Sequence, residues 1–191
     1  MTGLVIATSM IDGIKVNANG NFYWCDGVIF LAAFLLDPLA AFITGGIGTM
    51  IYDLLTPRAY NCIASLIIHG LQAAVVSVLV HYVFPRKNKK LEPLWAGISS
   101  VIGGALVVLG YFIQRYYILK LDNLVIGEKA IANVVQEIIG ISIAMVICYA
   151  TTFKKQLEKA HLLPDFTGEM LQKKQPAPTE EPPAEEQPKQ N

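Results

Sequence analysis

The chain has 191 residues, of which 53% are hydrophobic and 16% are charged, and its formal net charge is zero at pH 7. Its mean hydropathy is +0.46. This composition excludes an ordinary water-soluble domain and is typical of a chain that crosses a lipid bilayer. We therefore expect a protein surrounded by lipid, with no nucleic-acid partner.

The first residues form an apolar segment that is too short to span a membrane. Met1 to Ile11 would cross about half of the hydrocarbon core, which takes roughly 20 helical residues, and the following stretch, Asp12 to Asn21, is polar. A cleaved signal peptide would need a basic start and a longer apolar core. Two interpretations remain open: a helix that enters the membrane partway, or, as we favour, a natural start upstream of Met1.

The segment from Phe22 to Asp53 is too long for one ordinary span and too short for two. Asp37-Pro38 interrupts it, and proline disrupts a continuous helix because it lacks an amide hydrogen. One tilted helix over Val28 to Leu55 would put Tyr23 to Asp26 in the cytoplasm, whereas two short helices would put it outside. We favour two helices of about 12 residues, each roughly 18 Å long and sheltered by neighbouring helices.

Three glycines in this segment predict close helix packing. Gly45, Gly46 and Gly48 remove side-chain bulk from one stretch of helix, which lets another backbone approach. The sequence GGIG lacks the lysine and the Ser or Thr of a phosphate-binding loop.

Three further apolar runs each exceed the length needed for a full span. They are Ala59 to Phe84, Leu94 to Leu119 and Ala130 to Phe153. Lysine and arginine cluster after the first of these runs, in Pro85 to Lys90, and after the last, at Lys154, Lys155 and Lys159. The positive-inside rule places both basic clusters in the cytoplasm and the loop Lys120 to Lys129 outside.

Three regions follow from this pattern. Residues 1–153 are expected to form a transmembrane substrate-binding domain, and residues 154–171 a cytoplasmic extension of the last helix. Residues 172–191 hold five prolines and four glutamates, and alanine is their only apolar residue. Such a composition predicts a disordered tail, because it buries too little surface to offset the entropy of ordering.

Nothing in the sequence indicates catalysis, a cofactor or a metal site. Cys25, Cys62 and Cys148 are scattered without a CxxC pair, and we expect them to be small buried apolar residues. The nucleophile and metalloprotease motifs GxSxG, SxxK and HExxH are missing. The sequence therefore predicts that the chain is not an enzyme.

Polar residues inside the spans are the candidates for function, because they are costly in lipid. Asn133, Gln136, Glu137 and Gly140 share one helix face, and a second polar stripe lies on the preceding span. Both stripes fall in the predicted outer half, so we expect a cavity open to the outside for a small, planar, neutral or weakly charged solute. The predicted substrate-binding residues are Tyr23, Trp24, Asp26, Asn61, Ser65, His69, Tyr111, Gln114, Arg115, Asn133, Gln136 and Glu137.

An alternative remains for the same residues. Tyr111, Tyr116, Tyr117 and Trp24 could be interfacial aromatic residues, and the amides could bond between helices. Arg115 and Glu137 could also pair with each other. On that interpretation the chain is a small structural or accessory membrane subunit without a ligand.

Three stretches carry a resemblance to a known family. They are the run FYWCDGVIFLAAFLLDPLAAFITGGIG, the helix sequence NCIASLIIHGLQAAVVSVLV and the motif NVVQEIIG. Together they resemble S components, the substrate-binding membrane subunits of energy-coupling-factor (ECF) vitamin transporters. The similarity covers about residues 21–152 and is closest to the group that takes up hydroxymethylpyrimidine, pyridoxine and related vitamins.

The resemblance implies an all-α, six-helix membrane bundle, here with a truncated first helix and both termini cytoplasmic. It implies high-affinity binding of a small water-soluble vitamin from outside, followed by its translocation. The expected partners are an ECF transmembrane coupling subunit and two ATPase subunits that hydrolyse ATP, which agrees with the missing phosphate-binding loop.

The sequence departs from the family pattern at three places. His69 replaces the lysine of the IIKGL motif, and Asp37 replaces the usual glycine before Pro38. The AxxxA face that many members use for docking is not found in Met1 to Ile11. We therefore expect differences in cavity charge, in the inner turn and in docking.

Overall fold

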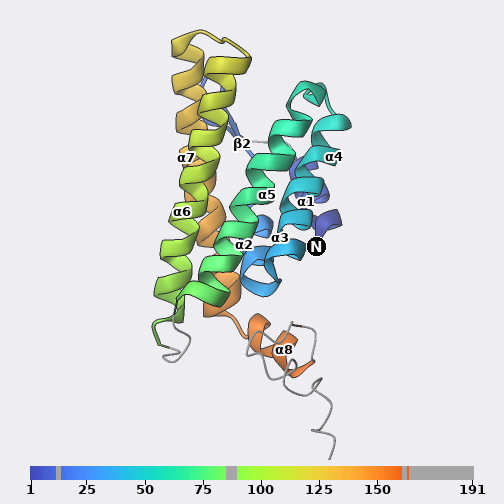
Figure 1. Cartoon of the computed structure of the whole chain (residues 1–191), viewed down its shortest axis with the longest axis vertical. Helices are drawn as coiled ribbons and strands as arrows, with labels where there is room; N and C mark the ends of the chain where they lie inside the picture. The colour runs from blue at the N-terminus through green and yellow to red at the C-terminus, as the bar shows by residue number, and fades with distance from the viewer. Residues whose placement is uncertain (12–13, 85–89, 161–162, 164–191) are drawn as a thin grey trace, which may run out of the picture.

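The computed structural model describes residues 1–11, 14–84, 90–160 and 163 and is all-α apart from one short hairpin. Figure 1 shows an elongated bundle in which α6 and α7 form a long pair beside α5, with α1, α3 and α4 on the other side of α5. The predicted all-α bundle is confirmed.

Six helical segments build this bundle within the described residues, and a short helix follows them. Some segments contain 3₁₀ or π turns, labelled η, which continue the neighbouring helix. In the N-terminal half the elements are α1 (Thr2–Met10), the antiparallel strands β1 (Ile14–Lys15) and β2 (Asn21–Phe22), α2 (Cys25–Leu35), α3 (Pro38–Phe42), η1 (Ile43–Ile47) and α4 (Gly48–Leu54). The others are η2 (Ala59–Asn61), α5 (Cys62–Val78), η3 (Leu79–Val83), α6 (Glu92–Ile113), η4 (Gln114–Ile118), α7 (Asn123–Met145), η5 (Val146–Ala150) and α8 (Phe153–Lys159).

Three of the segments are long and apolar enough to cross a membrane. They are Ala59–Val83, Glu92–Ile118 and Asn123–Ala150, and two shorter apolar helices cover Cys25–Leu35 and Pro38–Leu54. The three predicted full spans are therefore confirmed as helices of membrane length.

The predicted break at Asp37-Pro38 is confirmed, and a single tilted helix over this segment is wrong. α2 ends at Leu35, and the Asp37 carboxylate accepts hydrogen bonds from the backbone N–H groups of Leu39 (3.1 Å) and Ala40 (3.0 Å). An aspartate N-cap followed by proline in the first turn is a favourable helix start. Asp37, one of the departures from the resembled pattern, thus supplies a cap to the next helix.

α2 is the buried centre of the bundle. All its residues are buried, and Ile29, Phe30 and Phe34 are at most 1% exposed. Its neighbours are α1, α5 and α7. An 11-residue helix is only about 16 Å long, so this surrounding protein provides the shelter that the sequence required for so short a span.

The glycines predicted to allow close packing do so. A Cβ atom on Gly46 would lie 2.6 Å from the Leu66 carbonyl oxygen of α5, and one on Gly48 would lie 2.7 Å from Val5 of α1. Neither position leaves room for a side chain, so η1 and α4 pack directly on α5 and α1.

Two predicted boundaries need correction near the last span. α7 begins at Asn123, because Asp122 accepts a hydrogen bond from the Leu124 N–H (2.8 Å) and caps the helix. Most of the predicted loop Lys120 to Lys129 is therefore helix. At the other end, the extended backbone of Thr151 interrupts the helix, so α8 is a separate helix rather than a continuous extension. Residues 164–191, including the predicted tail, lie outside the described residues.

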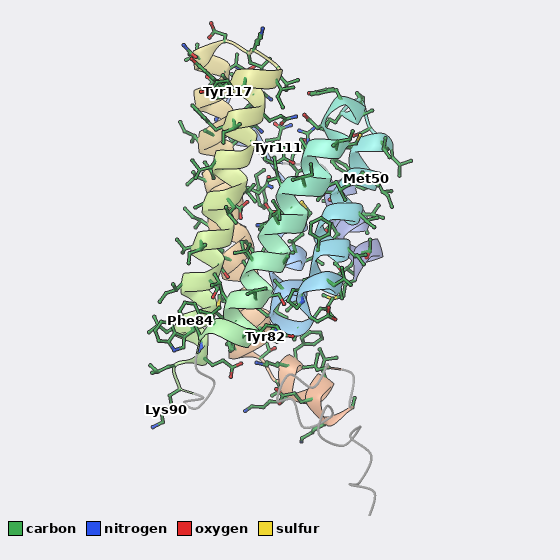
Figure 2. The ribbon with its side chains drawn as sticks, in the orientation of Figure 1. Met50, Tyr82, Phe84, Lys90, Tyr111 and Tyr117 are labelled. Atoms are coloured by element: carbon green, nitrogen blue, oxygen red, sulfur yellow. The ribbon has the colours of Figure 1, made fainter. Side chains whose placement is uncertain are left out.

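The two ends of the bundle are named here by the features that they carry. Figure 1 places α8 and the α2–α3 turn at one end, and Figure 2 places Lys90 there as well. We call this the basic end, since α8 carries Lys154, Lys155 and Lys159. The α4–η2 and η4–α7 connections lie at the opposite end, where the hairpin also sits. We call it the cavity end.

Candidate functional site

A polar cavity lies at the cavity end, between the β1–β2 hairpin and helices α4, α5, α6 and α7. Figure 2 places Tyr111 between α6 and α5 in this half of the bundle. Eight of the twelve predicted residues line the cavity: Tyr23, Asn61, Ser65, His69, Tyr111, Arg115, Asn133 and Gln136. The structure thus brings together side chains from β2–α2, η2–α5, α6–η4 and α7.

A hydrogen-bonded triad forms one wall. The Ser65 hydroxyl donates to Asp53 Oδ2 (2.5 Å) and lies 2.7 Å from the Tyr111 hydroxyl. Because the single Ser65 proton goes to the carboxylate, the Tyr111 hydroxyl donates to Ser65 Oγ. The triad fixes Tyr111, and with it the aromatic face that it presents between α5 and α6.

His69 joins the cavity to a set of buried polar groups. Its Nδ1 atom lies 2.9 Å from Gln72 Oε1 and 3.4 Å from Asp26 Oδ1. Both neighbours are acceptors, so Nδ1 carries the proton. The His69 ring also lines the cavity and meets the Tyr111 ring edge-on, with 5.6 Å between centroids.

The network continues from α5 to α7. The Gln72 amide donates to Glu137 Oε2 (2.9 Å), and the Gln136 amide donates to Asp26 Oδ2 (2.5 Å) and accepts from the Tyr23 backbone N–H (3.0 Å). All these side chains except that of Tyr23 are at most 7% exposed. We call Asp26, His69, Gln72, Gln136 and Glu137 the buried network.

The mouth of the cavity is cationic and aromatic. The Arg58 guanidinium lies over the Tyr23 ring, 4.4 Å from its centroid, and that of Arg115 lies 5.0 Å from the centroid of Tyr111. Arg115 Nη2 also donates to Asn133 Oδ1 (3.5 Å). Lys129 of α7 also lines the cavity.

The hairpin is fastened over this mouth by α7. The Asn17 side chain donates to the Glu128 carbonyl oxygen (2.7 Å), and the Asn19 amide donates to the Glu128 carboxylate (2.6 Å). A Cβ atom on Gly20 would lie 2.5 Å from the Ala132 side chain, so only glycine fits this contact.

Four predicted residues do not line the cavity. Asp26 and Glu137 belong to the buried network beneath it, and Trp24 packs edge-on against Phe22. Gln114 donates to Asn61 Oδ1 (2.8 Å) and so bonds η4 to η2, as the alternative interpretation expected of the amides. The Arg115–Glu137 pair is wrong: the salt bridges of the described residues are His69–Asp26 and Lys154–Glu92.

Several lining residues escaped the sequence analysis. Most of them lie in connections or at helix ends, where no helical stripe marks them, and Asp53 and Tyr52 lie where the second short helix ends. The missed polar and aromatic lining residues are Ser9, Asn19, Asn21, Thr49, Tyr52, Asp53, Arg58, Tyr60 and Lys129.

Two polar groups at the cavity lack a protein partner among the described residues. Arg115 Nη1 and Asn133 Nδ2 are buried donors without a hydrogen bond. Buried polar atoms are nearly always hydrogen-bonded, so such donors indicate a ligand or water as the partner. No group of three or more His, Cys, Asp or Glu residues able to hold a metal occurs in the part of the chain that the structure describes.

A bundle of membrane-length helices with a polar cavity at one end defines a membrane-embedded solute-binding protein. The family model described as ECF-type riboflavin transporter, S component, matches residues 1–153. Because this match covers most of the chain, the protein belongs to the S components of ECF transporters. No curated protein matches the chain.

Membership settles the class and leaves the substrate open. The chain is a transport subunit rather than an enzyme, and its family works with ECF membrane and ATPase modules on a vitamin substrate. The family match does not support the hydroxymethylpyrimidine and pyridoxine group suggested by the sequence resemblance.

Proposed function

We propose that the protein captures a planar heterocyclic vitamin from outside the cell in the cavity described above and delivers it to the ECF modules. The observation that carries this proposal is the convergence of polar and aromatic side chains from three membrane-length segments and the hairpin on one cavity. Helix–helix contacts alone have no reason to gather at one end of a bundle.

Charge supports the orientation. Lys90 and α8 lie at the basic end, which the positive-inside rule assigns to the cytoplasm. The cavity end then faces outside, where an imported solute arrives. On this proposal the Asp37-Pro38 turn and α8 are cytoplasmic.

The cavity wall supports a flat ring as the bound group. Tyr23, Tyr111 and His69 offer aromatic surface, and Asn61, Ser65 and Asn133 offer hydrogen-bonding groups around it. Aromatic stacking combined with a few placed polar groups is the usual way to bind a planar heterocycle. Riboflavin is the first ligand to test, since the matching family bears its name. Pyridine and pyrimidine vitamins come second, because of the sequence resemblance.

Binding by the purified full-length protein tests this function. We expect saturable, one-to-one binding of at least one vitamin from a panel that begins with riboflavin and includes pyridoxine and hydroxymethylpyrimidine. Riboflavin fluorescence and mass spectrometry of copurified ligand provide the readouts. If no vitamin binds at micromolar concentration, and substitutions in the cavity change only thermal stability, the accessory-subunit alternative replaces this proposal.

Transport tests the second half of the function. Cells that lack other uptake routes for the vitamin should accumulate it only when the chain and the ECF membrane and ATPase modules are expressed together. Accumulation without active ATPases would contradict the assignment of this chain as a passive binding subunit.

A further inference from the structure

We infer that the ligand carries a negatively charged group, a phosphate or a carboxylate, which Arg58, Arg115 and Lys129 recognise at the mouth of the cavity. This inference rests on the proposed function, because it names the substrate class of the same cavity. It replaces the neutral or weakly charged solute expected from the sequence.

Three cations from separate parts of the chain converge on the mouth. Arg58 follows α4, Arg115 lies in η4 and Lys129 lies in the second turn of α7, and all three line the cavity. The positive charge of Arg58 acts on both Arg115 and Lys129, and Arg115 also acts on Lys129. A cleft lined by one sign of charge concentrates solutes of the opposite sign.

Within the described residues, none of these cations forms a salt bridge. Neither of the two salt bridges formed within the described residues includes Arg58, Arg115 or Lys129. Among the described residues that line the cavity, Asp53 is the one carboxylate; Ser65 donates to it, and the positive charge of Arg58 acts on it. Three cations therefore face one carboxylate, and the excess positive charge is free for a ligand.

Arg115 and Asn133 make the site specific for an acceptor. Arg115 stacks on Tyr111, which leaves the N–H groups at the edge of its guanidinium for partners in the plane. Arg115 Nη1 and Asn133 Nδ2 have no partner among the residues that the structure describes, although the two side chains are joined by a 3.5 Å hydrogen bond. Adjacent orphan donors on a guanidinium and an amide match the oxygens of a phosphate or carboxylate.

The position of the cations separates two parts of the ligand. Ser65 and His69 lie deeper along α5 than Arg58, which precedes the helix. We assign the heterocycle to the deeper wall with Tyr111 and the anionic group to the mouth. The cations line the cavity rather than the outer surface of the bundle, so the ligand is a soluble anion and not a lipid headgroup.

Matched vitamin pairs test the inference on the full-length protein in non-ionic detergent. We compare riboflavin with riboflavin 5′-phosphate and pyridoxal with pyridoxal 5′-phosphate, and we measure thermal stabilisation by inorganic pyrophosphate alone. Hydrogen bonds to a charged group contribute about 1.5–3 kcal/mol, so the phosphorylated member of a pair should bind at least about tenfold more tightly.

Single substitutions test which residues cause the preference for the phosphorylated vitamin. Arg115→Gln and Lys129→Gln should reduce the phosphate preference to about threefold or less. The preference is a ratio within each vitamin pair, so an effect of either variant on the shared heterocycle cancels. Arg115→Lys should retain part of the preference, which shows that charge and not folding is responsible. Lys155→Gln is the matched control, because Lys155 is exposed on α8 at the basic end; it should bind like the wild type.

The outcomes separate this inference from the proposed function. Equal binding of both members of every pair, or a preference that survives Arg115→Gln, overturns the inference and leaves the function standing. If pyrophosphate stabilises the protein and Arg115→Gln abolishes this effect, the anion site is supported. If no vitamin binds in that case, the proposed function fails. If pyrophosphate does not stabilise the protein and no vitamin binds, both the inference and the proposed function are wrong. Stabilisation by short-chain phosphatidylglycerol without any response to pyrophosphate assigns the cations to lipid and overturns the inference.

Discussion

His69 belongs to both the buried network and the cavity wall. Its Nδ1 is committed to Gln72 and Asp26, while its ring borders the cavity beside Tyr111. A lysine at this position, as in the IIKGL pattern that the sequence resembles, could also donate a hydrogen bond but would lack the aromatic ring. The histidine therefore gives the cavity wall a different shape.

Substitutions of Glu137 test whether hydrogen bonds or charge stabilise the buried network. Its Oε2 accepts from Gln72, and it is 4% exposed. Glu137→Gln keeps an acceptor of the same shape, so the melting temperature should change by less than about 2 °C. Glu137→Ala leaves the Gln72 amide unsatisfied and should cost about 1–3 kcal/mol of unfolding free energy. Thermal unfolding in detergent measures both; an equal loss in the two variants would show that the charge itself is required.

Asn133 and Gln136 should behave differently, although they share one helix face. Asn133→Ala removes a donor that has no partner among the described residues and one long contact, 3.5 Å, with Arg115. It should therefore weaken vitamin binding about tenfold and change the melting temperature little. Gln136→Ala removes the donor to Asp26 and the acceptor of the Tyr23 N–H, so it should destabilise the protein by about 1–3 kcal/mol. Calorimetry and thermal unfolding of both variants check this difference; a loss of stability for Asn133→Ala would contradict its assignment to the ligand.

Among the elements, the segment from α3 to α4 combines two special features that place it against its neighbours. Asp37 caps its start, and its π turn, η1, brings Gly45 and Gly46 against the backbone of α5. Close approach of backbones replaces the hydrophobic driving force that is weak between helices in lipid. The packing brings Thr49 and Asp53 of α4 beside Ser65 of α5, which completes one wall of the cavity.

Gly46 gives a sharp test of this packing. In Gly46→Ala the new Cβ would meet a backbone oxygen of α5 at 2.6 Å, so the helices must separate, at a cost of about 1–3 kcal/mol. Gly97→Ala is the matched control, since a Cβ there has no neighbour within 4 Å; it should be neutral or should stabilise α6 by about 0.5–1 kcal/mol. Equal melting temperatures for the two variants would disprove the close contact.

For the whole molecule, the proposed orientation in a bilayer rests on the basic clusters at the end opposite the cavity. The basic residues Lys90, Lys154 and Lys155 lie at the end opposite the cavity. An ion pair between Lys154 and Glu92 ties α8 to the start of α6 at this end. On the proposed orientation, which puts the basic end in the cytoplasm, the cavity end faces the solutes outside.

Cysteine labelling in intact cells checks this orientation. On a background with Cys25, Cys62 and Cys148 replaced, Asp122→Cys should react with a membrane-impermeant maleimide added outside, whereas Asp37→Cys and Lys155→Cys should react only after the cells are opened. Asp37 and Asp122 cap helices at opposite ends of the bundle, so a reagent added outside should label a cysteine at only one of the two positions. External labelling of Asp37→Cys would reverse the topology.

Much of this architecture follows from local sequence signals. Apolar length predicted the three long spans, and Asp37-Pro38 predicted the break, because proline and an N-cap aspartate act within one turn. The capped start of α7 at Asp122 was missed, since the charges of Glu128 and Lys129 resembled those of a loop. The stripe Asn133, Gln136 and Glu137 predicted an inward-facing polar surface, and all three residues are buried.

The sequence by itself determined a membrane bundle with a polar half and a basic end, because span length, helical periodicity and lysine clusters are local properties. Only the tertiary structure decided which polar groups meet. It assigned Gln136 and Glu137 to the buried network, Gln114 to a helix contact, and Arg58 and Lys129 to the mouth of the cavity. Those assignments depend on how helices distant in the chain pack, and that packing fixes the charge that a ligand meets.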